Sequence, residues 1–253
     1  MHNRQSSARD GTIRYILVVD SKAQELFTTS LLLQRFDYQV WTANTTAQAL
    51  EMAAVAVPAL VIADLSLPGM NGMDLLHLLK QDPRTSSVPV VLLIPAGNEA
   101  IVKRCLDEGA AGCISRPIQA EELFRAVQAS VEPSPRENIR IETRLAVSVN
   151  NVPLKCIEGE CASILSEYGM YVPMTKPYPK NEQLTVQIKI NNRSVSVKAS
   201  VLYHHTYGEG PFKEPGMGLK FIGMASEDQD FIRQFIREET MKSINAGAVK
   251  NKL

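Results

Sequence analysis

Short apolar runs alternate with amphipathic segments over the first half of the chain. Five runs predict strands, at residues 15–19, 38–43, 59–63, 89–94 and 112–115. Five segments with apolar residues at helical spacing separate or follow them, at residues 22–35, 46–55, 74–81, 98–107 and 120–131. The runs around Val18, Val61 and Leu92 are apolar without alternation, which is typical of central strands covered on both faces. Residues 13–131 are therefore predicted to form a flavodoxin-like, doubly wound α/β domain with a five-stranded parallel sheet.

The second half of the chain has a different period. Apolar and polar residues alternate around Leu145–Val149, Leu184–Ile190 and Val195–Val201, which indicates half-buried antiparallel strands. The pairs Asn150-Asn151 and Asn191-Asn192 predict hairpin turns, because asparagine tolerates positive φ. We therefore expect an antiparallel β-barrel or β-sandwich in this half of the chain.

The boundaries of this second region follow from local composition. Residues 132–135 include two prolines and indicate an exposed linker. A helix is expected after the last strand, with a capping box of Ser226 and Gln229 and one apolar face made of Phe231, Ile232, Phe235 and Ile236. The barrel domain is thus placed at 136–242, with a flexible start at 1–12 and a frayed tail at 243–253.

The length, charge balance and composition of the chain limit the classes of function that it can have. A chain of 253 residues suits two domains. The 27 Lys+Arg balance the 27 Asp+Glu, so there is no general basic field, and DNA is not an expected partner. No apolar stretch is long enough to span a membrane, and the N-terminal residues lack a secretory signal, so we expect a cytoplasmic protein without membrane insertion. No nucleophile and base pair, P-loop or metal-ligand motif suggests an enzyme.

Two carboxylates follow strands that should be neighbours. Asp20 ends the first predicted strand and Asp64 ends the third, and a strand order of 2-1-3-4-5 would set these strands side by side. Paired carboxylates of this kind suit Mg²⁺, and a carboxylate beside Mg²⁺ can accept a phosphoryl group.

At these residues the sequence resembles the receiver domain of bacterial two-component response regulators. The resemblance rests on VVD ending at Asp20, on D-x-x-x-P-x-x-x-G from Asp64 to Gly72, and on G-A-x-x-x-x-x-P from Gly109 to Pro117. It implies that Asp64 is the phosphoacceptor for a histidine kinase and that Asp20 and Asp64 hold Mg²⁺.

Three positions depart from that family's pattern. Ser21 stands where a second acid completes the Mg²⁺ site, Ile94 stands where a Ser or Thr reports phosphorylation, and Arg116 stands where a lysine precedes proline. Each change alters the surroundings of a phosphoryl group. Ser21 has an alternative role as a helix N-cap with Gln24 as its partner. Asp64 is either a working phosphoacceptor or the relic of one.

Spaced arginines precede the first alternating strand. Arg136, Arg140 and Arg144 are four residues apart, and guanidinium groups both bind phosphate and stack on planar rings. Such a group suits a phosphate-bearing purine ligand, although arginines on an exposed strand face are also common.

The segment that follows looks like a PilZ domain, a family of small barrels that bind cyclic di-GMP, and this resemblance implies a six-stranded antiparallel β-barrel with a C-terminal helix. Its R-x-x-x-R motif falls on Arg136 and Arg140, its [D/N]-x-S-x-x-G motif on residues 164–169, and its G-x-G-x-x-F motif on residues 216–221. The resemblance implies that Arg136 and Arg140, together with Arg144, grip the ligand while Ser166 and Gly169 shape the opposing wall.

One residue of the second motif departs from the family. Ile164 replaces the Asp or Asn that would hydrogen-bond a guanine edge, which leaves polar atoms unpaired at a cost of roughly 1 to 3 kcal/mol. Ser166 and Gly169 are equally explained as a turn between two strands.

Two functions remain open from the sequence. The first is a bacterial signalling protein that couples a receiver-like module, with or without phosphorylation, to a cyclic di-GMP-binding output that acts through protein partners. The second is an interaction scaffold that has lost both activities. The partner and the oligomeric state, a homodimer included, are not given by the sequence.

Overall fold

The computed structural model describes residues 15–97, 99–154, 161–206 and 215–250. These residues form two compact units: the first is made of the residues up to Glu137 together with those from Met241 onward, and the second is Asn138–Thr240. Among the described residues, no helix is both long enough and apolar enough to cross a membrane.

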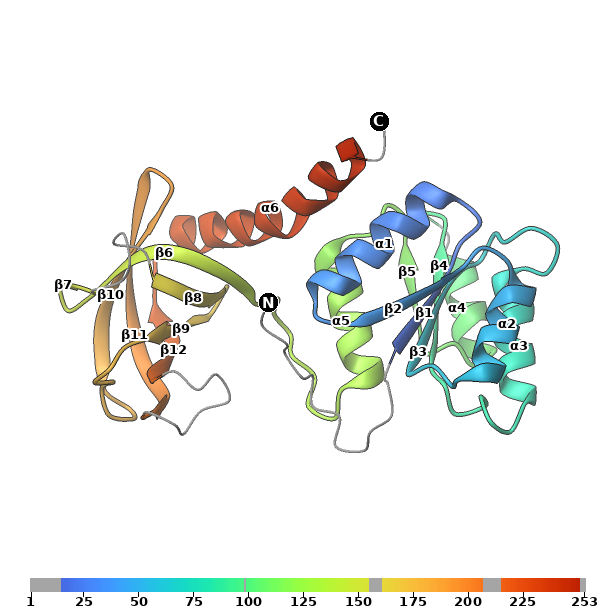
Figure 1. The fold of residues 1–253 in the computed structure, drawn as a ribbon, viewed down its shortest axis with the longest axis horizontal. Coiled ribbons are helices and arrows are strands. Elements are labelled where there is room, and N and C mark those ends of the chain that lie inside the picture. Colours follow the sequence, from blue (N-terminus) through green and yellow to red (C-terminus); the bar gives the residue numbers. More distant parts are fainter. Residues whose placement is uncertain (1–14, 98, 155–160, 207–214, 251–253) are drawn as a thin grey trace. The chain divides into compact units, whose positions relative to one another are not determined.

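The first unit is the doubly wound α/β domain that the apolar pattern predicts. Its parallel sheet has the strand order β2-β1-β3-β4-β5, with α1 and α5 on one face and α2, α3 and α4 on the other (Figure 1). The strands are β1 (Tyr15–Val19), β2 (Gln39–Ala43), β3 (Leu60–Asp64), β4 (Val90–Ile94) and β5 (Gly112–Ser115). The helices are α1 (Ala23–Arg35), α2 (Thr46–Val55), α3 (Gly72–Gln81), α4 (Glu99–Asp107) and α5 (Ala120–Val131).

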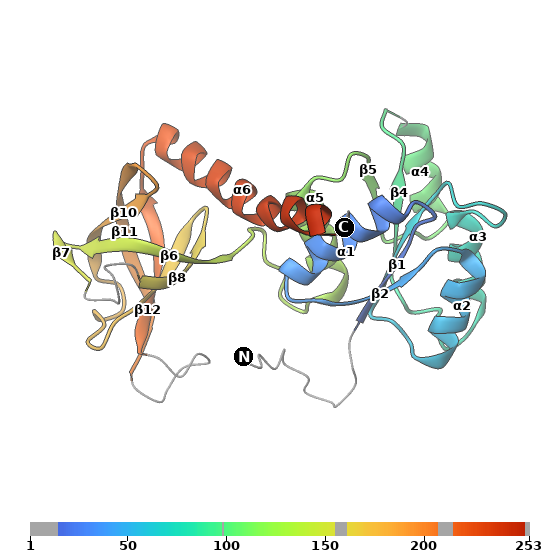
Figure 2. The same cartoon turned by 45° about the horizontal axis from the view of Figure 1, so that its top comes forward.

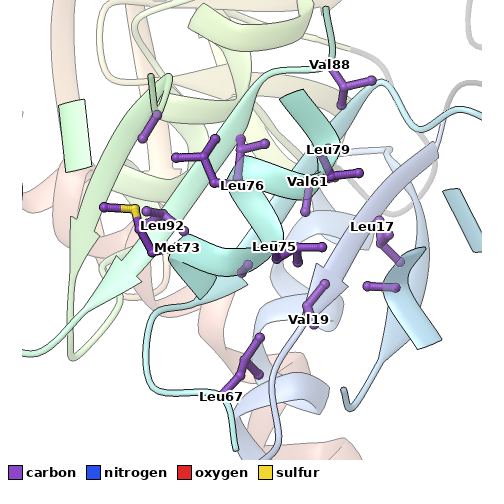
Figure 3. Packing of buried hydrophobic residues seen from close by; sticks show 14 of the residues in the cluster. Leu17, Val19, Val61, Leu67, Met73, Leu75, Leu76, Leu79, Val88 and Leu92 are labelled. Atoms are coloured by element: carbon purple, nitrogen blue, oxygen red, sulfur yellow. The ribbon is translucent and has the colours of Figure 1, made fainter. Parts of the chain in front are cut away.

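The core of this unit lies on both faces of the central strands. Leu17, Val61 and Leu92 point from β1, β3 and β4 toward the apolar side of α3, where Leu75 and Leu76 are fully buried (Figure 3). Because every residue of β1, β3 and β4 is buried, these strands can be apolar without alternation. This packing holds the carboxyl ends of β1 and β3 rigidly at one edge of the sheet.

The second unit is a closed antiparallel barrel. Six strands follow the order β10-β11-β12-β9-β8-β6, and a pairing between β10 and β6 closes the ring (Figure 2). The strands are β6 (Ile141–Val149), β8 (Cys161–Ser166), β9 (Gly169–Pro173), β10 (Gln183–Ile190), β11 (Arg193–His205) and β12 (Gly216–Gly223), and the short β7 (Val152–Pro153) pairs with the end of β6. The predicted fold is therefore confirmed.

Two-residue turns join the hairpins where the asparagine pairs predict them. Asn150 and Asn151 have φ values of 49° and 64°, and Asn191 has a φ of 53°. These left-handed conformations match the twist of the flanking strands, which explains the choice of asparagine.

The terminal helix differs from the prediction at both ends. Helix α6 (Ser226–Lys250) begins after Ala225, whose carbonyl oxygen accepts from the N–H groups of Asp228 and Gln229. The capping box predicted for Ser226 and Gln229 is therefore wrong, since Ser226 already lies inside the helix. The backbone is helical to Lys250, past residue 243, where we expected a frayed tail to begin. The apolar face is as predicted, with Ile232, Phe235 and Ile236 buried.

Ser163 gives a prediction about stability. Its hydroxyl lies in the barrel interior, and among the described residues it has no hydrogen-bond partner. A buried, unpaired hydroxyl costs about 1 to 3 kcal/mol, so Ser163→Ala should raise the free energy of unfolding by about 1 kcal/mol. Urea denaturation of the two proteins measures the change. Ser196→Ala, at an exposed strand position on β11, should change little, and a loss of stability in Ser163→Ala would contradict the expectation.

Candidate functional site

The carboxylates of Asp20 and Asp64 lie together at the end of the parallel sheet. Val19 on β1 pairs with Ala63 on β3, so the residues that follow them emerge side by side. Both are nearly inaccessible to solvent, at 1% exposed for Asp20 and 7% for Asp64. The juxtaposition expected from the strand order is present.

Arg116 occupies the space between these carboxylates. Its Nη2 donates to Oδ2 of Asp20 and, over 2.6 Å, to Oδ2 of Asp64, while its Nε donates to the same Asp64 oxygen over 3.0 Å. The backbone N–H of Arg116 donates to the carbonyl oxygen of Ile94 over 2.9 Å, which fixes the side chain's starting point beside β4. One guanidinium therefore joins the ends of β1 and β3.

The remaining oxygens of the two carboxylates are bound by the backbone. The N–H of Lys22 donates to Oδ1 of Asp20 over 2.8 Å, and the N–H of Ser66 donates to Oδ1 of Asp64 over 2.5 Å. All four oxygens of Asp20 and Asp64 thus accept a hydrogen bond from the protein itself.

Glu25 is a third acid at this site that the sequence reasoning missed. It lies in the first turn of α1 and accepts from Nη1 of Arg116 over 2.7 Å. An acidic residue in the first turn of the helix that follows β1 was the feature of the sequence that could have indicated it. Burial alone would lower the pKa of Arg116, but the hydrogen bond and charge of Asp64, with the charges of Asp20 and Glu25, raise it, so this guanidinium stays protonated.

The residues of this site do not fit Mg²⁺. Nη2 of Arg116 lies between the two oxygens that a metal would bridge, and within the described residues no group of acids, histidines or cysteines is arranged to hold a metal ion. Ser21 is exposed and supplies no replacement ligand. Its alternative role as an N-cap is also wrong, because α1 begins at Ala23 with Lys22 as the N-cap residue.

Ile94 and Gly72 complete the surroundings of Asp64. Ile94 ends β4, is 1% exposed, and has no side-chain hydrogen-bond donor. Gly72 begins α3, where an added Cβ would collide with the carbonyl oxygen of Asp64, so the loop after β3 can close only over glycine. The spacing of the motif from Asp64 to Gly72 therefore has a steric cause.

The three arginines of the second candidate site are solvent-exposed. Arg136 and Arg140 lie in the segment before β6, and Arg144 lies on β6. Exposure leaves all three available to a ligand, as the sequence analysis requires.

The backbone of Arg136 is anchored to the first unit. Its N–H donates to Oε1 of the buried Gln128 on α5 over 2.8 Å, and Nε2 of Gln128 donates to the hydroxyl of Tyr38 over 2.6 Å. Burial and the charge of Glu132 raise the pKa of Tyr38 to about 12, so the phenol stays neutral. Arg136 is therefore held by its main chain while its side chain is exposed.

Ser166 and Gly169 flank a tight turn between β8 and β9. The hydroxyl of Ser166 donates to the carbonyl oxygen of Gly169 over 2.9 Å, across a strand pair that joins the same two residues. A Cβ on Gly169 would collide with the carbonyl oxygen of Leu219 on β12. Their role in forming a turn is thus evident, and this role is compatible with a binding wall.

The strand register brings this turn to the arginine-bearing end of β6. Ile141 pairs with Leu165, so Arg140 and Ser166 are the next residues along their two strands. On β12, the exposed Lys220 pairs with Gly169 and adds a cation that the sequence reasoning did not single out.

An apolar and aromatic row runs across the same face. Ile164 pairs with Tyr171, Tyr171 with Gly218, and Gly218 with Tyr203. The ring of Tyr203 lies against the backbone of Gly218 and stacks on Tyr171 with 6.5 Å between ring centroids. Ile164 therefore adjoins an aromatic surface, and the glycine of the last motif is the only residue type that makes room for Tyr203.

Glu167, inside the turn, is tied to the terminal helix. Its Oε1 accepts from Nη2 of Arg233 over 2.5 Å and from Nε2 of Gln229 over 3.2 Å. Burial raises the pKa of Glu167, but the hydrogen bond and charge of Arg233 outweigh it and hold the pKa below its usual value. The turn and α6 are thus joined by an ionic contact at neutral pH.

Comparison with known proteins identifies both units. Residues 16–128 match the response regulator receiver domain, and residues 134–238 match the PilZ domain. Two-component response regulator ORR3 of Oryza sativa subsp. indica is 30% identical over 112 residues, which are 44% of this chain and 86% of that protein. Response regulator PleD of Caulobacter vibrioides is 33% identical over 114 residues, 45% of this chain and 25% of PleD. The receiver domain of NtrX from Brucella abortus superimposes with a TM-score of 0.44 and 27% identity, over 47% of this chain and 99% of that one.

Proposed function

Since the chain belongs to the response-regulator family and joins a receiver domain to a PilZ domain, we propose that it is a signalling protein whose output responds to cyclic di-GMP. The PilZ domain would bind the ligand, and the change would be read by a protein partner of the whole chain. The receiver domain implies a second kind of partner, a histidine kinase. The proposed function is binding alone, and the ligand is not chemically changed.

The register between β6 and β8 carries this proposal. It sets Arg140 and Ser166 at adjoining strand ends, next to a turn whose Gly169 leaves no room for a side chain. The exposed guanidinium of Arg140 can pair with a phosphate and stack on a guanine, because arginine offers both a planar fork and a flat face. Arg136 and Arg144 supply further positive charge for a ligand with two phosphates.

Binding at these arginines would also order the connector. Arg136 and Arg140 stand on opposite sides of the division at Glu137, and Arg136 is held by Gln128 through its main chain. A ligand that engages both side chains would restrict the backbone between them.

The test is isothermal titration with cyclic di-GMP. We expect the native protein to bind and Arg140→Ala to bind about tenfold to a hundredfold more weakly, the equivalent of a lost charge-assisted hydrogen bond. Arg104→Ala, which removes an exposed arginine from α4, is the matched control and should bind normally.

Ile164 offers a test in the opposite direction. Ile164→Asn restores a polar group opposite a guanine edge and should tighten binding about tenfold. Absence of heat in both the native protein and Ile164→Asn would rule out the binding function.

The alternative is an interaction scaffold without ligand chemistry. The specific observation in its favour is that an isoleucine and an aromatic row, Tyr171 and Tyr203, occupy the wall where a polar contact to guanine is expected. Under this alternative the native protein gives no titration with cyclic di-GMP, and Arg140→Ala has no effect on partner binding.

A further inference from the structure

The acidic site of the receiver domain already contains a cation. Nη2 of Arg116 contacts Oδ2 of both Asp20 and Asp64, Nε gives Asp64 a second hydrogen bond, and Nη1 contacts Glu25. A single guanidinium thus bridges carboxylates from β1, β3 and α1. Its side chain is only 17% exposed, which distinguishes this arrangement from an ordinary surface ion pair.

The site is satisfied without any added ion. Lys22 and Ser66 bind the other oxygens of the two aspartates through their N–H groups, so no oxygen of either carboxylate lacks a donor. A planar guanidinium suits this set because its donors form a fixed fork, whereas a compact ammonium in the same place could not reach three carboxylates together.

From this geometry we propose that Arg116 is the resident cation of the receiver site and takes the place of a divalent metal. Mg²⁺ requires oxygen ligands at about 2.0 to 2.1 Å in a near-octahedral arrangement, and the oxygens that would provide them contact Arg116 instead. Asp64 is then held as a structural carboxylate and is not available to a phosphoryl donor. The receiver domain keeps one conformation whether or not a kinase or Mg²⁺ is present.

This proposal is independent of cyclic di-GMP. It concerns side chains of the first unit alone, and it holds or fails whatever the PilZ domain binds. It also explains the departures at Ser21 and Ile94, because a site that takes neither metal nor phosphoryl group needs neither a third acid nor a reporter hydroxyl.

The first experiment uses the native protein. Its amide NMR spectrum is recorded with MgCl₂ at about 10 mM, which saturates a site of submillimolar dissociation constant, and then with beryllium fluoride, a mimic of the phosphoryl group. The amides of Lys22 and Ser66, which donate to the two aspartates, report on the site. We expect no shift at either. A saturable shift with Mg²⁺, or formation of an acyl phosphate at Asp64 with acetyl phosphate, would overturn the proposal.

The second experiment removes the guanidinium of Arg116 from the acidic site. Arg116→Gln removes the cation and retains a polar side chain, and Arg116→Lys retains a charge that cannot reach all three carboxylates. Mg²⁺ titration should show saturable binding, which the native protein lacks, for whichever of the two variants folds, as judged by circular dichroism. Arg104→Gln, which loses an exposed partner of Glu108, should behave as the native protein. A folded Arg116 variant that gains no Mg²⁺ binding would show that Arg116 is not what excludes the metal, and the proposal would fail.

Discussion

Replacing Arg116 with methionine is expected to lower the free energy of unfolding by about 3 to 5 kcal/mol, because the change leaves buried carboxylates without their counter-charge. Methionine keeps an unbranched apolar stem and lacks the guanidinium, so the loss reports mainly on the missing charge and its hydrogen bonds. Asp20 is 1% and Asp64 7% exposed, and solvent cannot replace the guanidinium between them. Guanidinium chloride denaturation of the variant and the native protein at pH 7 measures the difference.

Two further variants make this result specific. Arg104→Met breaks an exposed pair with Glu108 and should leave the stability nearly unchanged, because solvent screens that pair. Adding Asp64→Asn to Arg116→Met removes one of the stranded charges and should recover part of the stability. If Arg116→Met were no less stable than Arg104→Met, the guanidinium would not be compensating buried charge.

The second large effect is expected at Gly169. In Gly169→Ala the new Cβ would collide with the carbonyl oxygen of Leu219, a backbone atom of the neighbouring strand that cannot rotate away. The strands β9 and β12 must separate locally, at a cost of about 3 kcal/mol in the free energy of unfolding. The same displacement breaks the hydrogen bond from Ser166 and should weaken binding of cyclic di-GMP at least a hundredfold, or about 2.7 kcal/mol.

Gly223→Ala provides the matched comparison. A Cβ on Gly223, at the end of β12, would have as its nearest neighbour the side chain of Lys198 at 3.5 Å, an ordinary contact. That variant should keep both its stability and its ligand affinity within about 0.5 kcal/mol of the native protein. Equal losses in the two variants would mean that glycine is needed only for strand propensity, and that the close approach at Gly169 has no particular consequence.

The fold could be read from the sequence because its two halves have different apolar periods. Continuous runs such as that around Val61 need cover on both faces, and alternating runs such as Leu184–Ile190 need it on one, and the structure has these two kinds of strand. The capping residues were less predictable. Ser21 and Ser226 have the right residue type for an N-cap, but the chain direction at each helix start places Lys22 and Ala225 there instead.

The candidate site was predictable only as far as strand order determines it. Adjacent strands place Asp20 beside Asp64, and that expectation required no side-chain detail. The position of the Arg116 guanidinium depends on rotamers and on Glu25, which the sequence separates from it by 91 residues. From the sequence, Arg116 is expected to be an altered neighbour of a phosphoryl group, whereas in the structure it is bound to both aspartates, a contact that no spacing rule predicts.

The ionic contact between Glu167 and Arg233 forms a joint between the β8–β9 turn and α6. From Arg233 to Lys250 the helix rises about 25 Å at 1.5 Å per residue, so a tilt of about 10° at the joint would move the far end by about 4 Å. Glu167 lies between Ser166 and Gly169, so this contact ties the proposed ligand-binding turn directly to the helix. Acidification weakens the same contact. The pKa of Glu167 is lowered in the folded protein, so the contact stabilises the fold fully at pH values above the usual pKa of glutamate. This stabilisation is lost as the pH falls through the lowered pKa of Glu167.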